Sequence, residues 1–276
     1  MARLLRVDLK RILKDKLFLV VCIIGAVLAV TTPLLYKALV VFLQIESEDL
    51  ASSIFSIQSV FYSSFSLTNN LGIIIPVFLL IIMAKDFSFG TIRNKIVSGN
   101  SRTNVFLSMF ISCGIVLVCS MLAYALLTGL ISLALFSDSI GTINKEAILY
   151  LVSSIVFEIL IFIFIAALLS FINVFCKNVG LKIIVYVAIT LLFTALYGIL
   201  QVAISMMIFN GTDNQLLIDA LEVILKLNIF YSNTGIIGMV EKYSTEDIIC
   251  ILSSTILGSG LFILLGIVCL NKKDIK

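Results

Sequence analysis

The sequence predicts an all-α membrane protein with six transmembrane helices, and composition is the first observation behind this prediction. Of the 276 residues, 61% are apolar and only 13% are charged, about half the charged share of a soluble domain. The mean hydropathy is +1.20. A soluble domain needs a polar surface that this composition does not supply. The composition therefore excludes a single soluble domain, a disordered chain and a nucleic-acid-binding module.

The second observation is the length of the apolar stretches. A helix needs about 20 apolar residues to cross about 30 Å of hydrocarbon. Stretches nearly free of Asp, Glu, Lys and Arg predict spans at about 17–43, 66–84, 103–136, 148–176, 183–210 and 248–271. They form one transmembrane domain that covers the whole chain, 1–276. Because six is an even number, we expect both termini on the same side of the membrane.

The third observation is the distribution of charge between the two faces that these spans define. The face that holds both termini, the 85–102 loop and the loop between the fourth and fifth spans carries 15 of the 19 Lys and Arg residues. The opposite face carries eleven of the 16 acidic residues. The positive-inside rule therefore places both termini in the cytoplasm. Because the composition is typical of a bacterial protein and no organelle signal is identified, we expect the spans in a bacterial plasma membrane. The basic face is expected to contact anionic lipids and not nucleic acid.

Residues 1–16 are expected to form an amphipathic helix before the first span. Leucine and isoleucine recur there at helical spacing, and arginine and lysine occupy another face. A basic amphipathic helix beside a span lies in the headgroup layer. The alternative is a charge cluster that only sets the topology.

The loop 85–102 is expected to carry a short, rigid helix from about Ile92 to Ser98. Thr91 is expected to cap its N-terminus, and Gly99 stands where a left-handed C-terminal cap is typical. Ser101 then opens the next span. The helix mixes apolar and basic side chains, which suits docking on a soluble partner: Ile92, Arg93, Lys95, Ile96 and Val97. An ordinary loop between spans, with charges that only set topology, is the alternative.

The segment 213–247, before the last span, is expected to lie outside the membrane on the opposite face. Apolar residues repeat every three or four positions from Leu216 to Leu225, which predicts an amphipathic helix. A looser stretch from Ser232 to Gly238 follows. The segment either rests on the outer leaflet or dips into the protein.

Glu158 is the candidate intramembrane functional carboxylate, because it is the one ionisable residue in its apolar run. Such a carboxylate serves as a proton site or as a counter-ion for a substrate. The alternative places it at the outer interface, if the hydrocarbon is crossed by the last 20 or so residues of the run.

Catalysis by this chain is not expected. Histidine is absent, and the six cysteines show no CxxC spacing, so we interpret them as small buried thiols and assign no metal site. Neither a phosphate-binding loop nor a nucleophile elbow appears in the sequence. We therefore assign no catalytic, cofactor-binding or metal-binding residue.

The spans also lack the rows of polar groups that a channel filter needs, and the two halves do not read as inverted repeats. This pattern favours an energised transporter whose motor is a separate chain.

The order of these parts resembles the membrane subunit of ABC-2-type ATP-binding-cassette transporters. The most specific local similarity is Asp86 followed by Gly90–Arg93, with Ser101–Arg102 opening the third span. In that family, an acidic residue and a Gly-Thr pair lead into the coupling helix.

The resemblance implies a permease that pairs with a second permease subunit, the same or homologous, and with cytoplasmic P-loop ATPases. The ATP and Mg²⁺ would then be held by the partner ATPase. The coupling helix would dock on the ATPase through Thr91, Ile92, Arg93, Lys95, Ile96 and Ser98. The expected cargo is an amphiphilic peptide, a drug or a lipid-like molecule, and the expected direction is export.

Two other functions stay open at this point. The first is the substrate-capturing subunit of an energy-coupling-factor importer, which also has about six spans and no nucleotide site. The second is a membrane protein that confers immunity to a bacteriocin by binding alone. The long basic N-terminal helix argues against the importer subunit.

Overall fold

The computed structural model describes residues 1–42, 57–68, 71–135, 145–209, 215–237 and 243–273, and every regular element in them is a helix. These helices are α1 (Ala2–Lys14), α2 (Lys16–Phe42), α4 (Ile57–Ser63), α5 (Leu71–Ser88), α6 (Thr91–Val97), α7 (Arg102–Leu135), α8 (Lys145–Phe175), α9 (Val179–Phe209), α10 (Gln215–Lys226), α11 (Ile229–Ile237) and α12 (Thr245–Lys272). Among them, α2, α5, α7, α8, α9 and α12 are long and apolar enough to cross a membrane. The predicted fold class, an all-α membrane protein, is confirmed.

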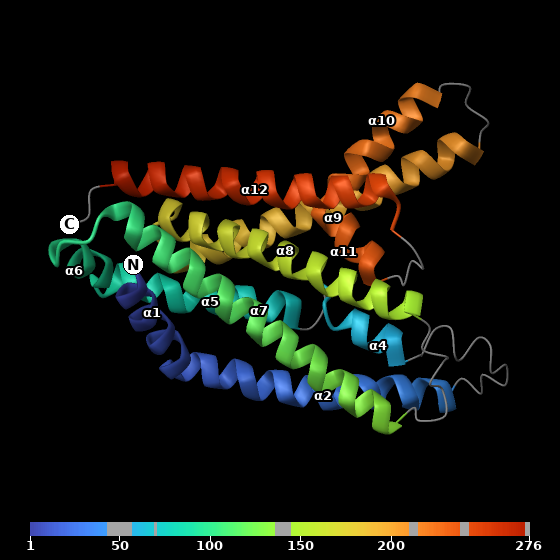
Figure 1. The fold of residues 1–276 in the computed structure, drawn as a ribbon, viewed down its shortest axis with the longest axis horizontal. Coiled ribbons are helices and arrows are strands. Elements are labelled where there is room, and N and C mark those ends of the chain that lie inside the picture. Colours follow the sequence, from blue (N-terminus) through green and yellow to red (C-terminus); the bar gives the residue numbers. More distant parts are fainter. Residues whose placement is uncertain (43–56, 69–70, 136–144, 210–214, 238–242, 274–276) are drawn as a thin grey trace.

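The six long helices run back and forth along the longest axis of the molecule (Figure 1). Both chain ends lie at one end of the bundle together with α1 and α6, which we call the basic end. The helices α4, α10 and α11 lie at the other end, which we call the opposite end. The two termini therefore share one side, as the even number of spans requires.

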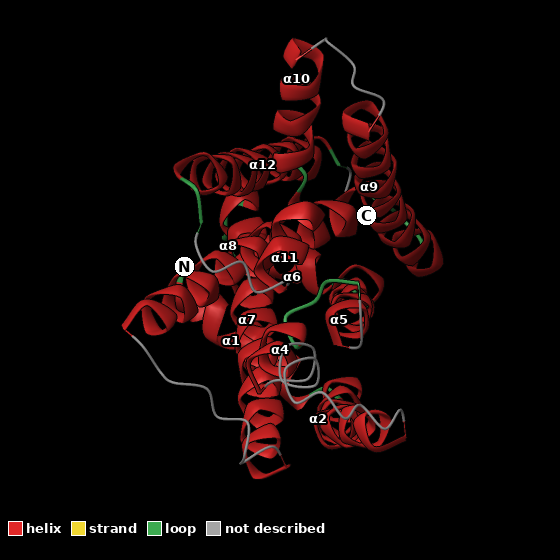
Figure 2. Cartoon of the chain, turned by 90° about the vertical axis from the view of Figure 1, so that its right-hand side faces the viewer, coloured by secondary structure: helices red, strands yellow, loops and turns green. Residues whose placement is uncertain are grey.

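Helices α7 and α8 form the centre of the bundle, and α9 lies farther out (Figure 2). Of the residues in the most apolar part of α8, 67% are buried. The corresponding shares are 11% for α12 and 6% for α9. An apolar helix exposes such a face when lipid or another subunit covers it. The exposed faces of α9 and α12 are thus the ones that the surroundings of the protein must cover.

The second span differs from its prediction. It begins at Leu71 and not at residue 66, because residues 64–66 form a turn after α4. The hydroxyls of Ser63 and Ser64 both donate to the carbonyl of Val60, at 2.8 and 3.1 Å, and serine side chains that bond the backbone in this way favour turns over helix interiors. The other five spans agree with their predicted bounds to within four residues.

The segment before the last span holds two helices. The predicted amphipathic helix is α10, whose Ile218 and Leu225 are buried. The looser stretch predicted from Ser232 is wrong as far as Ile237, because α11 is helical there. Asn228 stabilises the start of α11 by accepting the N–H of Phe230 at 3.0 Å. Ile229, Phe230 and Ile236 are buried, so α11 dips into the protein; residues 210–214 and 238–242 lie outside the described residues.

Candidate functional site

The short helix α6 lies at the tip of the basic end. A glycine with left-handed backbone angles precedes it, and another follows it. Gly90, with φ of 65°, holds the N-cap position, so the prediction that Thr91 caps the helix is wrong, and Thr91 is instead its first residue. Gly99, with φ of 91°, follows the helix as predicted, and its N–H donates to the carbonyl of Ile96 at 3.0 Å. Only glycine adopts these angles without strain. The two turns therefore fix where α6 begins and ends.

The residues predicted to dock a partner divide between two faces of α6. On the inner face, Ile92 and Lys95 are only 2% and 9% exposed. On the outer face, Arg93, Val97 and Ser98 are exposed, while Thr91 and Ile96 are half-buried. The side chains of Phe89 and Val97 are 77% and 79% exposed. The prediction that Lys95 and Ile92 contact a partner is thus wrong, because the bundle itself covers both.

Lys95 is turned inward because it pairs with a buried carboxylate of the N-terminal helix. Its Nζ lies 2.5 Å from Oδ1 of Asp8, and the hydroxyl of Ser108 on α7 donates to the other oxygen of Asp8 at 2.7 Å. Asp8 is 2% exposed. Burial lowers the pKa of the Lys95 ammonium, and the nearby Asp8 carboxylate opposes that shift. Asp8 thus joins α1, α6 and α7 at one point.

Sequence reasoning missed Asp8, although a signal for it exists. Asp8 lies three residues after Leu5 and four before Ile12, so it falls on the apolar face of the amphipathic helix. An acidic side chain that the apolar face of a helix buries against the protein needs a cationic partner. The identity of that partner, 87 positions along the chain, could not be read from the spacing.

Two further ion pairs tie α1 to the end of α5. Arg11 pairs with the buried Asp86, the acidic residue of the sequence resemblance. Lys85 pairs with Asp15, at 2.6 and 2.8 Å from its two carboxylate oxygens. Burial pushes the pKa of Asp15 upward, but the bonds from Lys85 and from the N–H of Leu17 outweigh it, so the pKa lies below its usual value. Together these pairs make α1, α6 and the ends of α5 and α7 one connected unit.

Arg102, the residue that opens the third span in the resemblance, ties α7 to α12. Its guanidinium donates to the carbonyls of Leu270, Asn271 and Lys273 at 3.0, 2.8 and 2.9 Å. A cation at the C-terminus of a helix satisfies carbonyls that have no partner within the helix. The connected unit at the basic end therefore reaches the last span as well.

Glu158 lies inside the apolar span Leu149–Phe175 of α8 and is 1% exposed. The side-chain nitrogen of Asn233 on α11 donates to both carboxylate oxygens of Glu158, at 2.9 and 3.1 Å. A functional role for Glu158 stays a prediction.

Asn233 also binds the turn after α4. Its nitrogen donates to the carbonyl of Phe65 at 3.0 Å, and its oxygen accepts the N–H of Leu67 at 3.0 Å. One amide thus joins α8, α11 and residues 65–67 at the opposite end. Sequence reasoning missed Asn233 because it lies in a stretch predicted to be loose, and the hydrogen-bond partners of an amide 75 positions from Glu158 leave no local pattern.

Two lysines that the sequence analysis interpreted only as topology signals pack on one aromatic ring at the basic end. The Nζ atoms of Lys182 and Lys273 lie 4.8 and 4.9 Å from the ring centre of Phe87, a cation–π geometry. Lys182 donates to Oδ1 of Asn173 and Lys273 to the carbonyl of Val174, both at 2.6 Å. These contacts connect α5, α8, α9 and the end of α12.

Across the described parts of the chain, no group of three or more His, Cys, Asp or Glu side chains could hold a metal ion. All six cysteines are free thiols. Their interpretation as buried thiols is wrong for Cys22 and Cys119, which are exposed on the sides of α2 and α7.

No known protein-family model matches this chain, and no curated protein matches its sequence. The resemblance to ABC-2 permeases therefore stays a prediction that depends on the residues around α6.

Proposed function

We propose that this chain is the membrane-spanning permease subunit of an ABC transporter of the ABC-2 type. In this proposal, both termini are cytoplasmic in a bacterial plasma membrane, and an amphiphilic peptide, drug or lipid-like substrate is exported. The observation that carries the proposal is α6: a short helix bounded by two turns and held by a buried ion pair at the tip of the basic end. None of the described residues covers its outer face.

The outer face of α6 has the composition of a docking surface. Phe89 and Val97 are largely exposed beside Arg93. Aromatic residues and arginine are enriched where proteins bind one another, and exposed apolar side chains in a cluster mark contact sites. The helix lies beside both chain ends and not along the lipid-facing sides of the long helices (Figure 1), so a soluble partner fits it better than lipid.

The connections behind α6 supply a route for mechanical coupling. A displacement of α6 acts on Asp8 through Lys95, and Asp8 is bound to α7 through Ser108. Arg11 and Asp15 extend the connection to α5. A partner that pulls on α6 would therefore move α1 together with the ends of α5 and α7 that lie at the basic end. The partner ATPase would hold the ATP and Mg²⁺, and this chain would contribute no catalytic residue.

The proposal is tested by copurification from native membranes in mild detergent. The wild-type chain is expected to bring down a P-loop ATPase with vanadate-sensitive activity. Replacing Arg93 and Val97 together by glutamate reverses charge and polarity on the docking face, so we expect the recovery of ATPase to fall by roughly thirtyfold, the loss expected from an interface residue worth about 2 kcal/mol.

The control is Lys177→Glu, which reverses one positive charge, as Arg93→Glu does, at an exposed position between α8 and α9. It is expected to leave the recovery unchanged. Equal recovery with the Arg93 and Val97 variant would contradict docking on α6. A separate membrane scaffold in place of the ATPase would favour the importer subunit, and a chain that purifies alone would favour the immunity protein.

A further inference from the structure

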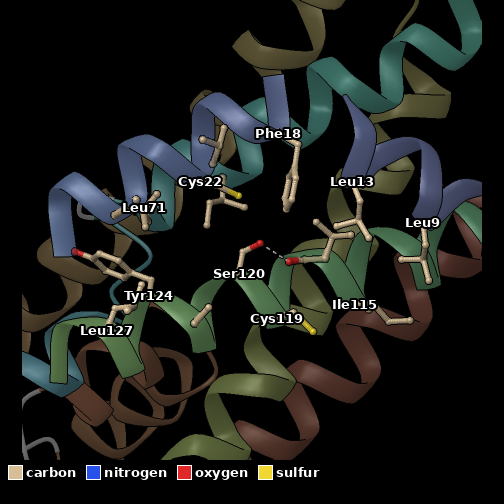
Figure 3. Close-up of a pocket in the computed structure, with 16 residues that line it drawn as sticks. Leu9, Leu13, Phe18, Cys22, Leu71, Ile115, Cys119, Ser120, Tyr124 and Leu127 are labelled. Carbon is tan, nitrogen blue, oxygen red and sulfur yellow. Dashed lines mark hydrogen bonds between the residues drawn. The ribbon is translucent and has the colours of Figure 1, made fainter. Parts of the chain in front are cut away.

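A lateral groove runs between α2 and α7, with α5 behind it and α1 at one end. It encloses about 450 Å³. Leu9 and Leu13 of α1 close the end nearest the chain termini, and Leu71, Tyr124 and Leu127 lie at the far end (Figure 3). The groove is separate from the outer face of α6 and from Glu158.

The groove exists because small residues face one another across it. Gly25 and Ala26 of α2 and Ala123 of α7 are among its lining residues, and larger side chains there would fill the space. The lining carries two hydroxyl groups. That of Ser120 donates to the carbonyl of Val116 at 2.7 Å, whereas that of Tyr124 is buried and has no hydrogen-bond partner among the described residues. Apart from these two hydroxyl groups the lining side chains are apolar or thiols, a surface that suits a hydrocarbon chain.

The groove opens sideways and not into the bundle. Cys22 and Ala26 on the α2 edge, and Cys119 and Ala123 on the α7 edge, are all exposed. In a membrane-spanning bundle these positions face the acyl chains of the lipids. A lipid can therefore enter the groove from the bilayer without any opening of the bundle.

The length of the groove matches one leaflet. Along α7 it extends from Ile115 to Leu127, and twelve residues of helix rise about 18 Å. Half of the hydrocarbon core is about 15 Å thick. Because α1 at the basic end closes one end of the groove, a lipid whose headgroup lies at that end belongs to the leaflet that meets the basic end.

The positive charge near the α1 end of the groove favours a lipid with a negatively charged headgroup. Lys10, Lys14 and Lys16 are exposed where α1 joins α2, and among the described residues no acidic side chain forms an ion pair with any of them. The acidic residues of α1 are already engaged, Asp8 by Lys95 and the adjacent Asp15 by Lys85. Juxtamembrane lysines without partners attract anionic lipids.

We propose that this groove binds an anionic phospholipid, with one acyl chain between α2 and α7 and its phosphate beside the lysines of α1. The lipid is a resident ligand and not cargo. The site depends only on a membrane position for the six long helices, so it stands whether or not the chain is a permease.

The test uses nanodiscs that contain the full chain and a photoactivatable phosphatidylglycerol with a diazirine in its acyl chain. Phosphatidylcholine with the same labelled chain is the comparison lipid. At limiting lipid, phosphatidylglycerol is expected to label peptides covering residues 21–26 and 115–127 preferentially. Ala123→Phe fills the groove and is expected to abolish this labelling, whereas Ala195→Phe makes the same change at an exposed position of α9 and is expected to preserve it.

A second variant tests the headgroup without altering the groove. Replacing Lys10 and Lys14 by glutamine is expected to reduce the preference for phosphatidylglycerol over phosphatidylcholine by roughly thirtyfold, from the energy that each juxtamembrane lysine contributes. Equal labelling by the two lipids in the wild type would overturn the proposal. So would groove labelling that survives Ala123→Phe, or chain-to-chain crosslinks that show a second copy covering the groove.

Discussion

Replacing Lys95 by alanine is expected to lower the free energy of unfolding by about 3–5 kcal/mol, because it leaves a buried carboxylate without its cation. The exposed fractions of Asp8 and Lys95 are 2% and 9%, so water does not replace the lost partner. The melting temperature in detergent is expected to fall by about 10 °C. The measurement is made on the chain alone, without any ATPase. A residue that only contacts a partner would leave this melting temperature unchanged.

The matched control for this prediction is Lys85→Ala. Lys85 also pairs with an aspartate of the N-terminal region, but its side chain is 37% exposed. Since exposed pairs contribute about 1 kcal/mol or less, the melting temperature is expected to change little. A similar fall for both variants would contradict the special role of the buried pair.

A double variant separates the buried pair from the rest of the packing. Replacing Asp8 by leucine and Lys95 by methionine removes both charges and keeps the volume, so most of the lost stability is expected to return. If the double variant is as unstable as Lys95→Ala, the destabilisation comes from packing and not from an unpaired charge.

Asn233→Ala is expected to lower the free energy of unfolding by about 3–5 kcal/mol, since three buried groups lose a hydrogen-bond partner and one of them is a carboxyl group. These groups are Glu158, the carbonyl of Phe65 and the N–H of Leu67. Thermal unfolding in detergent checks the prediction. Asn104→Ala, at an exposed position near the start of α7, is the control and is expected to have no measurable effect.

A double-mutant cycle shows whether Glu158 and Asn233 act as a unit. If they do, Asn233→Ala costs less when Glu158 is already alanine, and the coupling energy is about 1–3 kcal/mol. Additive losses would mean that Asn233 stabilises only the turn at residues 65–67.

The spans and the short helix near residue 92 could be predicted from the sequence because both depend on local chemistry. Long runs without charge mark the spans, and a pair of glycines nine positions apart bounds α6. The start of the second span could not be predicted, because serines that bond the backbone end α4 inside a stretch that contains no charged residue. Periodicity does not distinguish a buried turn from a buried helix there.

The inward position of Lys95 could not be predicted for a different reason. A basic residue in a loop between spans is equally consistent with docking, with topology and with a buried ion pair. The choice among them depends on Asp8, which packing brings within 2.5 Å. The partner of Glu158 could not be predicted either, because Asn233 lies on α11, a helix that packing brings against α8. Arg93 and Val97 have no such buried partner, and both are exposed on the outer face of α6, where a docking residue must lie.

A crosslink at position 97 shows directly whether α6 docks a P-loop ATPase. Val97 is 79% exposed on the outer face of α6, so a photoreactive amino acid placed there reaches whatever covers this face in native membranes. We expect a single crosslinked product that contains a P-loop ATPase and that disappears when Arg93 is replaced by glutamate. Crosslinks only to lipid, or only to a second copy of this chain, would contradict a docking role for α6.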